Sequence, residues 1–134
     1  VSPSYISPIQ GLQRLQKIMD EYVGGVGTWY MTSKYMLEEG FYYLNLLKED
    51  SYHMCAENLH ELLRAWENFH RIIAGEAHAR HIHFREETRY PGYYYRGDHL
   101  AIDDENWKCF VNSTYDKETL EWNIFKREYH QLVS

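Results

Sequence analysis

The sequence predicts a mainly α fold with a β extension, namely an antiparallel three-helix bundle followed by a small antiparallel hairpin or sheet. Apolar residues recur at three- and four-residue steps up to about residue 85, the period of a helix with one apolar face. Further along, apolar and polar residues alternate, the period of a half-buried strand. The expected division is a helical bundle over residues 1–90 and an extended segment with a hairpin over 91–134, packing on the bundle or on a partner.

The predicted helices span about 9–23, 33–52 and 57–85. Ser7 is placed to cap the first helix and Gly24 to end it. Gly40 lies inside the second helix, where glycine costs about 1 kcal/mol relative to alanine, so we expect a neighbouring helix to approach closely there. The third helix carries an apolar stripe made of Leu59, Leu62, Leu63, Trp66, Phe69, Ile73 and Ala77. Short connections between amphipathic helices predict antiparallel packing.

The tail has the pattern of a small sheet. A first strand is expected from Trp107 to Tyr115, a turn at 116–119, a second strand over 121–125 and a third over 129–133. An isolated hairpin is marginally stable in water, so the tail is expected to pack on the bundle or on another chain.

Composition excludes several classes of function. The 134 residues are enough for one domain with a modest core. The glycines at 24, 25 and 27 follow a helical pattern rather than a strand, so they predict no dinucleotide-binding turn. A net charge of −6 argues against a nucleic-acid partner. Because no apolar run approaches about 20 residues and no leader is seen, we expect no membrane insertion and a cytoplasmic location.

The histidines and cysteines give no strong metal pattern. Two ExxH motifs, Glu57 to His60 and Glu67 to His70, have the ligand spacing of di-iron bundles, but about 15 Å of helix separates them, too far to share a metal pair. In the cluster of His78, His81 and His83, the third side chain is expected to point away from the other two. Cys55 and Cys109 form no CxxC motif and are expected to be reduced thiols. We therefore predict no metal site, with the histidines on an exposed or docking face.

The densest run of charged and aromatic residues joins the two halves. We expect Pro91 to end the third helix, and Arg96 to pair with Asp98 through two parallel hydrogen bonds. Tyrosine and arginine together are typical of interface centres, and the alternative is a solvated charge cluster beside a tyrosine patch. The candidates for domain docking are Arg85, Glu87, Arg89, Tyr94, Arg96, Asp98 and Trp107.

Two motifs in this run resemble a known family. The RxExxR motif (Arg85, Glu87, Arg89) and the DDENW motif (residues 103–107) resemble the C-terminal region of the succinate dehydrogenase and fumarate reductase flavoproteins. The Tyr90-Pro91 insertion departs from that pattern, and Tyr94 stands where the wider family has histidine. The runs RYPGYYYR and ENWKCFVNS are more similar to the adenylylsulfate reductase alpha-subunit branch, and this likeness covers nearly the whole chain.

The resemblance implies a C-terminal domain that braces the FAD-bearing body of an enzyme interconverting adenylylsulfate with sulfite and AMP. It places FAD in an upstream part of the alpha subunit and iron–sulfur clusters in a beta subunit, so these two are the implied partners. No catalytic, cofactor-binding or metal-binding residue is expected in this chain. The alternatives are the equivalent domain of another fumarate-reductase-like flavoprotein, or a non-enzymatic helical adaptor. Val1, Pro3 and Pro8 suggest a linker from something upstream, and a trimmed terminus would look the same.

Overall fold

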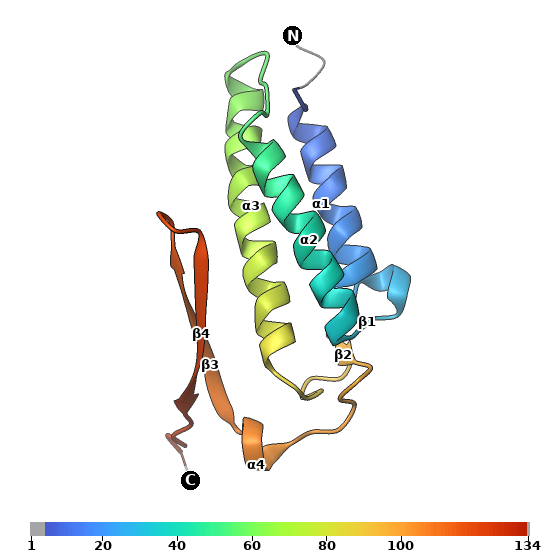
Figure 1. Ribbon diagram of the computed structural model, residues 1–134, viewed down its shortest axis with the longest axis vertical. Coiled ribbons are helices and arrows are strands. Elements are labelled where there is room, and N and C mark those ends of the chain that lie inside the picture. The colour runs from blue at the N-terminus through green and yellow to red at the C-terminus, as the bar shows by residue number, and fades with distance from the viewer. Residues whose placement is uncertain (1–4, 134) are drawn as a thin grey trace.

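The computed structural model describes residues 5–133, and three helices lie side by side in it with a hairpin beside them (Figure 1). The helices are α1 (Pro8–Tyr22), α2 (Lys34–Ser51) and α3 (Leu59–Phe84). Consecutive helices run in opposite directions (Figure 1). The predicted antiparallel bundle is therefore confirmed, with boundaries within about two residues of those expected. Val1 and Pro3 of the predicted linker lie outside the described residues.

Polar side chains begin each helix. The Ser7 hydroxyl accepts a hydrogen bond from the Gln10 backbone N–H, and the Gln10 side chain accepts one from the Ser7 N–H, which together form a capping box at α1. Ser33 and Asn58 accept equivalent bonds at the starts of α2 and α3. These caps satisfy amide groups that have no partner inside a helix.

The core lies between the three helices. A Cβ atom on Gly40 would lie 2.9 Å from the Tyr22 Cβ atom, so the glycine allows α2 to pack closely against α1, as expected. The buried apolar cluster consists of Leu15, Ile18, Val23, Leu37, Leu44, Leu47, Ile72, Ala79 and Ile82. From α3, the residues that enter the core are therefore Ile72, Ala79 and Ile82, none of which belongs to the stripe found in the sequence.

The connection between α1 and α2 contains structure that the sequence did not predict. It holds a short 3-10 helix, η1 (Val26–Thr28), and a two-residue strand, β1 (Met31–Thr32). Strand β1 pairs in parallel with β2 (Tyr95–Arg96), which comes after all three helices. This pairing fixes the lower end of the bundle in Figure 1 to the segment that follows α3.

The tail forms the predicted hairpin with changed limits. Strand β3 (Cys109–Asp116) pairs antiparallel with β4 (Glu121–Glu128). The expectation that the first strand starts at Trp107 was wrong. Trp107 instead belongs to the short helix α4 (Asp104–Trp107). The Asp103 side chain caps the start of this helix by accepting a hydrogen bond from the Asn106 N–H. The expected third strand is also absent from residues 129–133, and none of the described helices is long and apolar enough to cross a bilayer.

Candidate functional site

Residues 85–107, here called the return segment, carry the chain from α3 back to the hairpin around a buried carboxylate. The Glu87 side chain is fully buried. It accepts hydrogen bonds from Arg85 Nη1 at 2.7 Å, from Arg89 Nε at 2.6 Å and Nη2 at 3.0 Å, and from the Asp103 backbone N–H at 2.9 Å. Burial alone would raise the pKa of Glu87, but these hydrogen bonds outweigh it and hold the pKa below its ordinary value. The Glu87 carboxylate is therefore a charged hub, and both of its oxygens accept hydrogen bonds.

The two arginines on this hub also reach the tail. Arg85 donates to the backbone carbonyls of Trp107 at 2.7 Å and Cys109 at 2.9 Å. Arg89 forms an ion pair of 2.9 Å with Asp104 at the start of α4. The hydrogen bonds from Arg89 to Glu87 raise the pKa of Arg89 further. One buried acid thus fixes the base of the hairpin to the end of α3.

The Arg96 side chain caps the C-terminal end of α3. Its guanidinium Nη1 donates to the carbonyls of Ile82, His83 and Arg85 at 2.8, 3.0 and 3.1 Å. The last carbonyls of a helix have no intrahelical partner, and here one buried arginine satisfies them. The expectation that Pro91 ends the helix was wrong, because α3 stops at Phe84, ahead of the proline.

The predicted clamp between Arg96 and Asp98 is confirmed. Nε and Nη2 of Arg96 donate to the two carboxylate oxygens at 2.9 and 2.8 Å. The hydrogen bonds from Arg96 lower the pKa of Asp98 from 3.8 to about 2. Asp98 also accepts a hydrogen bond of 3.2 Å from the Lys34 N–H at the start of α2.

The two aromatic docking candidates, Trp107 and Tyr94, also make contacts within this chain. The Trp107 ring is buried, meets the Phe84 ring edge-on at 5.5 Å and has the Lys126 ammonium 3.7 Å from its centroid. Tyr94 packs against the core, and burial raises the pKa of its hydroxyl. All seven candidates therefore hold the return segment together, and a docking role for them stays a prediction.

A turn with exposed tyrosine rings lies within the return segment. Tyr90 begins a turn that the Tyr93 N–H closes by donating to the Tyr90 carbonyl at 3.1 Å. Gly92 in this turn has a φ of 96°, which favours glycine. The turn contains the Tyr90-Pro91 insertion and exposes the rings of Tyr90 and Tyr93. The segment expected to be extended from residue 91 therefore begins with this turn, and strand structure starts only at Tyr95.

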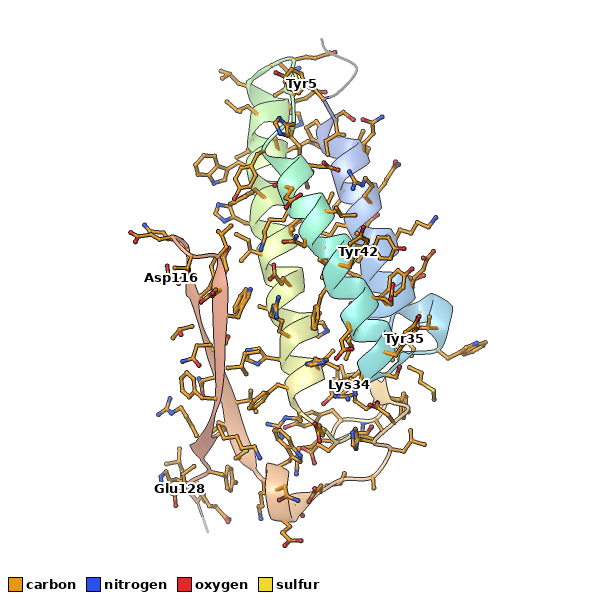
Figure 2. The ribbon with its side chains drawn as sticks, viewed as in Figure 1. Tyr5, Lys34, Tyr35, Tyr42, Asp116 and Glu128 are labelled. Atoms are coloured by element: carbon orange, nitrogen blue, oxygen red, sulfur yellow. The ribbon has the colours of Figure 1, made fainter. Side chains whose placement is uncertain are left out.

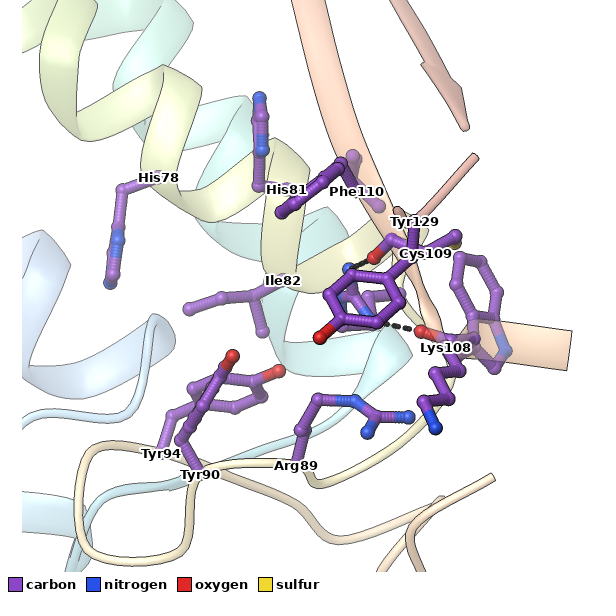
Figure 3. A pocket seen from close by; sticks show the side chains of 13 residues that line it. His78, His81, Ile82, Arg89, Tyr90, Tyr94, Lys108, Cys109, Phe110 and Tyr129 are labelled. Atoms are coloured by element: carbon purple, nitrogen blue, oxygen red, sulfur yellow. Dashed lines mark hydrogen bonds between the residues drawn. The ribbon is translucent and has the colours of Figure 1, made fainter. Parts of the chain in front are cut away.

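A groove of about 530 Å³ separates the hairpin from α3 and the return segment (Figure 3). His78 and His81 line its helix side, and His81 Nε2 lies 2.8 Å from the Ser113 hydroxyl on β3. Partial desolvation of the rings lowers the pKa of both histidines. Repulsion from His81 lowers the pKa of His78 further, and repulsion from Arg85 lowers that of His81 further. The side chain of Tyr129 and the return-segment side chains of Arg89, Tyr90 and Tyr94 close the other sides.

A second buried carboxylate holds the turn end of the hairpin. Glu76 on α3 pairs with Lys48 at 2.9 Å and with Arg80 at 3.1 Å, and it accepts a hydrogen bond of 2.8 Å from the Trp122 indole N–H. The Trp122 ring packs on Tyr115 at 4.7 Å. The sequence analysis missed this site, since nothing in the local sequence around Glu76 identifies partners on α2 and β4.

The glycines that follow α1 form a loop around the Asp20 side chain. The amides of Gly25 and Gly27 donate to the Asp20 carbonyl at 3.2 Å and to its carboxylate at 2.9 Å. A loop that already encloses a carboxylate does not fit a flavin pyrophosphate. Over residues 5–133, no three His, Cys, Asp or Glu side chains gather in a metal-binding group. His70, from one ExxH motif, instead packs on the Trp66 ring.

Comparison with known proteins extends the resemblance over the whole chain. No protein-family model matches it. The chain is 55% identical over 133 residues to the adenylylsulfate reductase alpha subunit of Megalodesulfovibrio gigas. It is similar to the C-terminal part of that subunit. The match covers 99% of this chain and 20% of the M. gigas protein, so the chain spans about a fifth of the length of that relative.

Solved structures give the same result in three dimensions. Adenylylsulfate reductase from Archaeoglobus fulgidus is 54% identical, with a TM-score of 0.97 over 100% of this chain and 21% of that chain. An adenosine-5-phosphosulfate reductase solved as a covalent adduct with sulfite matches with the same identity, coverage and TM-score. The fold of the whole chain is therefore shared with these solved reductases.

Proposed function

We propose that this chain is the C-terminal domain of an adenylylsulfate reductase alpha subunit and braces the FAD-bearing body of that enzyme. The observation that carries the proposal is the 55% identity over 133 residues to an adenylylsulfate reductase alpha subunit, supported by the TM-score of 0.97 to solved reductases. A fold so fully cross-linked by buried ion pairs suits a rigid support, because few of its contacts loosen independently.

The proposed reaction is the reduction of adenylylsulfate by an electron pair to give sulfite and AMP, or its reverse. FAD is assigned to the polypeptide upstream of this chain and iron–sulfur clusters to a beta subunit. The proposed location is the cytoplasm. This chain contributes no reacting group, because the side chains that would carry charge to a substrate, Arg85, Arg89 and Arg96, already hold Glu87, Asp98 and backbone carbonyls.

Activity of the complete protein tests the reaction. We expect purified material to contain flavin and to reduce an electron acceptor only when AMP and sulfite are both present. Fumarate reduction without that activity would favour another fumarate-reductase-like flavoprotein. A flavin-free native species of 16.2 kDa, or a multiple of that mass, would favour a helical adaptor.

A matched pair of variants tests the bracing role. Arg89→Ala in the complete enzyme is expected to weaken the attachment of this domain and to lower flavin occupancy, because it removes a partner of the buried Glu87. Lys117→Ala in the exposed hairpin turn is the control and should change neither. Equal flavin content in the two variants would contradict the proposal that the return segment supports the flavin-bearing body.

A further inference from the structure

One face of α3 is apolar but only half covered. Leu59, Trp66, Ile73 and Ala77 follow at steps of seven, seven and four residues, so they share one face of the helix at 100° per residue. Four residues further, His81 bonds to Ser113 of the hairpin. Ile73 and Ala77 are half-buried, whereas Leu59 and Trp66 are 83% and 66% exposed. Figure 1 shows the hairpin beside the C-terminal half of α3 only.

The exposed half is a continuous patch. Leu62 and Leu63 flank the line from Leu59 to Trp66, and both are more than half exposed. This N-terminal α3 face, defined as Leu59, Leu62, Leu63 and Trp66, thus continues the surface that the hairpin meets further along. Four large apolar side chains in adjacent turns form a patch that water-exposed surfaces seldom carry without a partner.

The first described residues lie against the same end of the bundle. The Ile6 carbonyl accepts a hydrogen bond of 3.0 Å from the Cys55 N–H, and Ile6 forms a parallel bridge with Met54 just before α3. Tyr5 stacks on His53 at 6.4 Å and lines a depression of about 550 Å³ together with Leu59 and Leu62. In Figure 2, Tyr5 lies at the end of the bundle where α3 begins.

We infer that the N-terminal α3 face is the docking surface for the polypeptide that precedes this chain, an inference that rests on the proposed function. The matched region is the C-terminal fifth of the M. gigas alpha subunit, so about four fifths of such a protein comes before it. In such a protein the longer part leads into this domain through the residues before Tyr5, and Tyr5 lies beside Leu59 and Leu62. A covalently joined body held at this point has a high effective concentration at the patch.

The occupant must be mainly apolar with a mixed polar rim. The helix positions around the patch alternate in charge, with Glu61, Arg64, Glu67 and Arg71 along its edges. Glu67 and Arg71 pair with each other at 3.6 Å, so the rim presents little net charge. A strongly anionic or cationic partner therefore gains no advantage here, whereas an apolar patch on a neighbouring domain does.

Oxidative footprinting of the complete alpha subunit tests the inference, with each residue compared with its own rate in unfolded protein. Trp66 is 66% exposed in this chain and the buried Trp107 is 8% exposed, so coverage to the level of Trp107 lowers the labelling of Trp66 about eightfold. Trp66 labelling at the rate of an exposed side chain would overturn the inference. This readout needs no enzyme activity, so it can fail or succeed independently of the proposed reaction.

Two further arms identify the occupant. Protection that persists when the alpha subunit is made alone and diluted indicates the preceding polypeptide. Protection lost on dilution would indicate a second copy, and protection that appears only with the beta subunit would indicate that subunit, so either result would overturn the inference. Leu63→Asp should restore labelling of Trp66 severalfold, whereas Leu132→Asp, at an exposed site near the other end of the chain, should leave it unchanged. Equal protection in both variants would also contradict it.

Discussion

The return segment and the hairpin are attached to the bundle in opposite ways. In the return segment, the buried Glu87 and Arg96 side chains make their bonds to residues within about sixteen positions along the chain. The body of the hairpin is joined to α3 by two side-chain hydrogen bonds, from Trp122 to Glu76 and between His81 and Ser113. The buried side chains of the return segment thus bond to sequence neighbours, while its strand β2 and Asp98 also reach residues 31–34. The body of the hairpin depends on a few contacts to distant residues.

The largest effect is expected from removing the arginine that ends α3. Arg96→Ala removes the guanidinium donor of three backbone carbonyls, and it leaves the Asp98 carboxylate with the Lys34 N–H but without its charged partner. Loss of one partner of a buried ion pair costs about 3–5 kcal/mol, so urea denaturation should show a loss of that size in the free energy of unfolding. Arg96→Lys keeps the charge but not the planar fork and should recover only part of it. A loss no greater than that of an exposed residue would show that the return segment is not fixed in this way.

A smaller loss is expected at the other arginine site. Arg89→Ala removes two of the four hydrogen bonds to Glu87, while Arg85 and the Asp103 N–H remain. A hydrogen bond to a charged group contributes about 1.5–3 kcal/mol. Because the two lost bonds come from one guanidinium and are not additive, a decrease of roughly 2–3 kcal/mol in the free energy of unfolding is expected. Lys117→Ala supplies the reference for an exposed charge, and equal values for the two variants would show that Glu87 is not a hub.

Loss of a contact between the hairpin and α3 should loosen the hairpin without loosening the helical bundle. Trp122→Phe keeps the stacking on Tyr115 but removes the hydrogen bond to Glu76, which retains Lys48 and Arg80. The expected cost is about 1 kcal/mol, measured as faster amide hydrogen exchange in β3 and β4 with unchanged exchange in α2. Phe125→Leu, on an exposed side chain of β4, is the matched control. Equal acceleration in the bundle would contradict the local attachment.

A further expected effect is a dependence of the free energy of unfolding on pH. The folded pKa of Asp98 is about 2, below its ordinary 3.8. Because the folded value is depressed, the stability that it contributes is present above pH 3.8 and is lost as pH falls from 3.8 toward 2. Asp98→Asn should remove this part of the acid-induced loss in unfolding free energy. An unchanged slope between those pH values would show that the clamp with Arg96 does not hold the charge.

The same contrast explains what the sequence predicts. The arginines around Glu87 and the clamp at Asp98 have partners two residues away, so spacing alone suggests them. The bond between Trp122 and Glu76 joins residues 46 positions apart, and no local pattern identifies it. The α3 stripe was found by its period, but period does not tell which of two faces enters the core. Here Ile72 and Ala79 enter it, and Leu59 does not.

The parallel pair of β1 and β2 also bears on the order of folding. Next to it, Lys34 binds Asp98 across 64 residues of chain, whereas the hairpin turn closes when the Leu120 N–H donates to Asp116 at 2.7 Å. Local hairpins form in about 1–10 μs, but a pairing that closes such a long loop bears a greater entropic cost and forms late. Refolding is therefore expected to assemble helices and hairpin first. The β1–β2 pair, and with it the Arg96 contacts to the end of α3, should complete the fold in the slowest step.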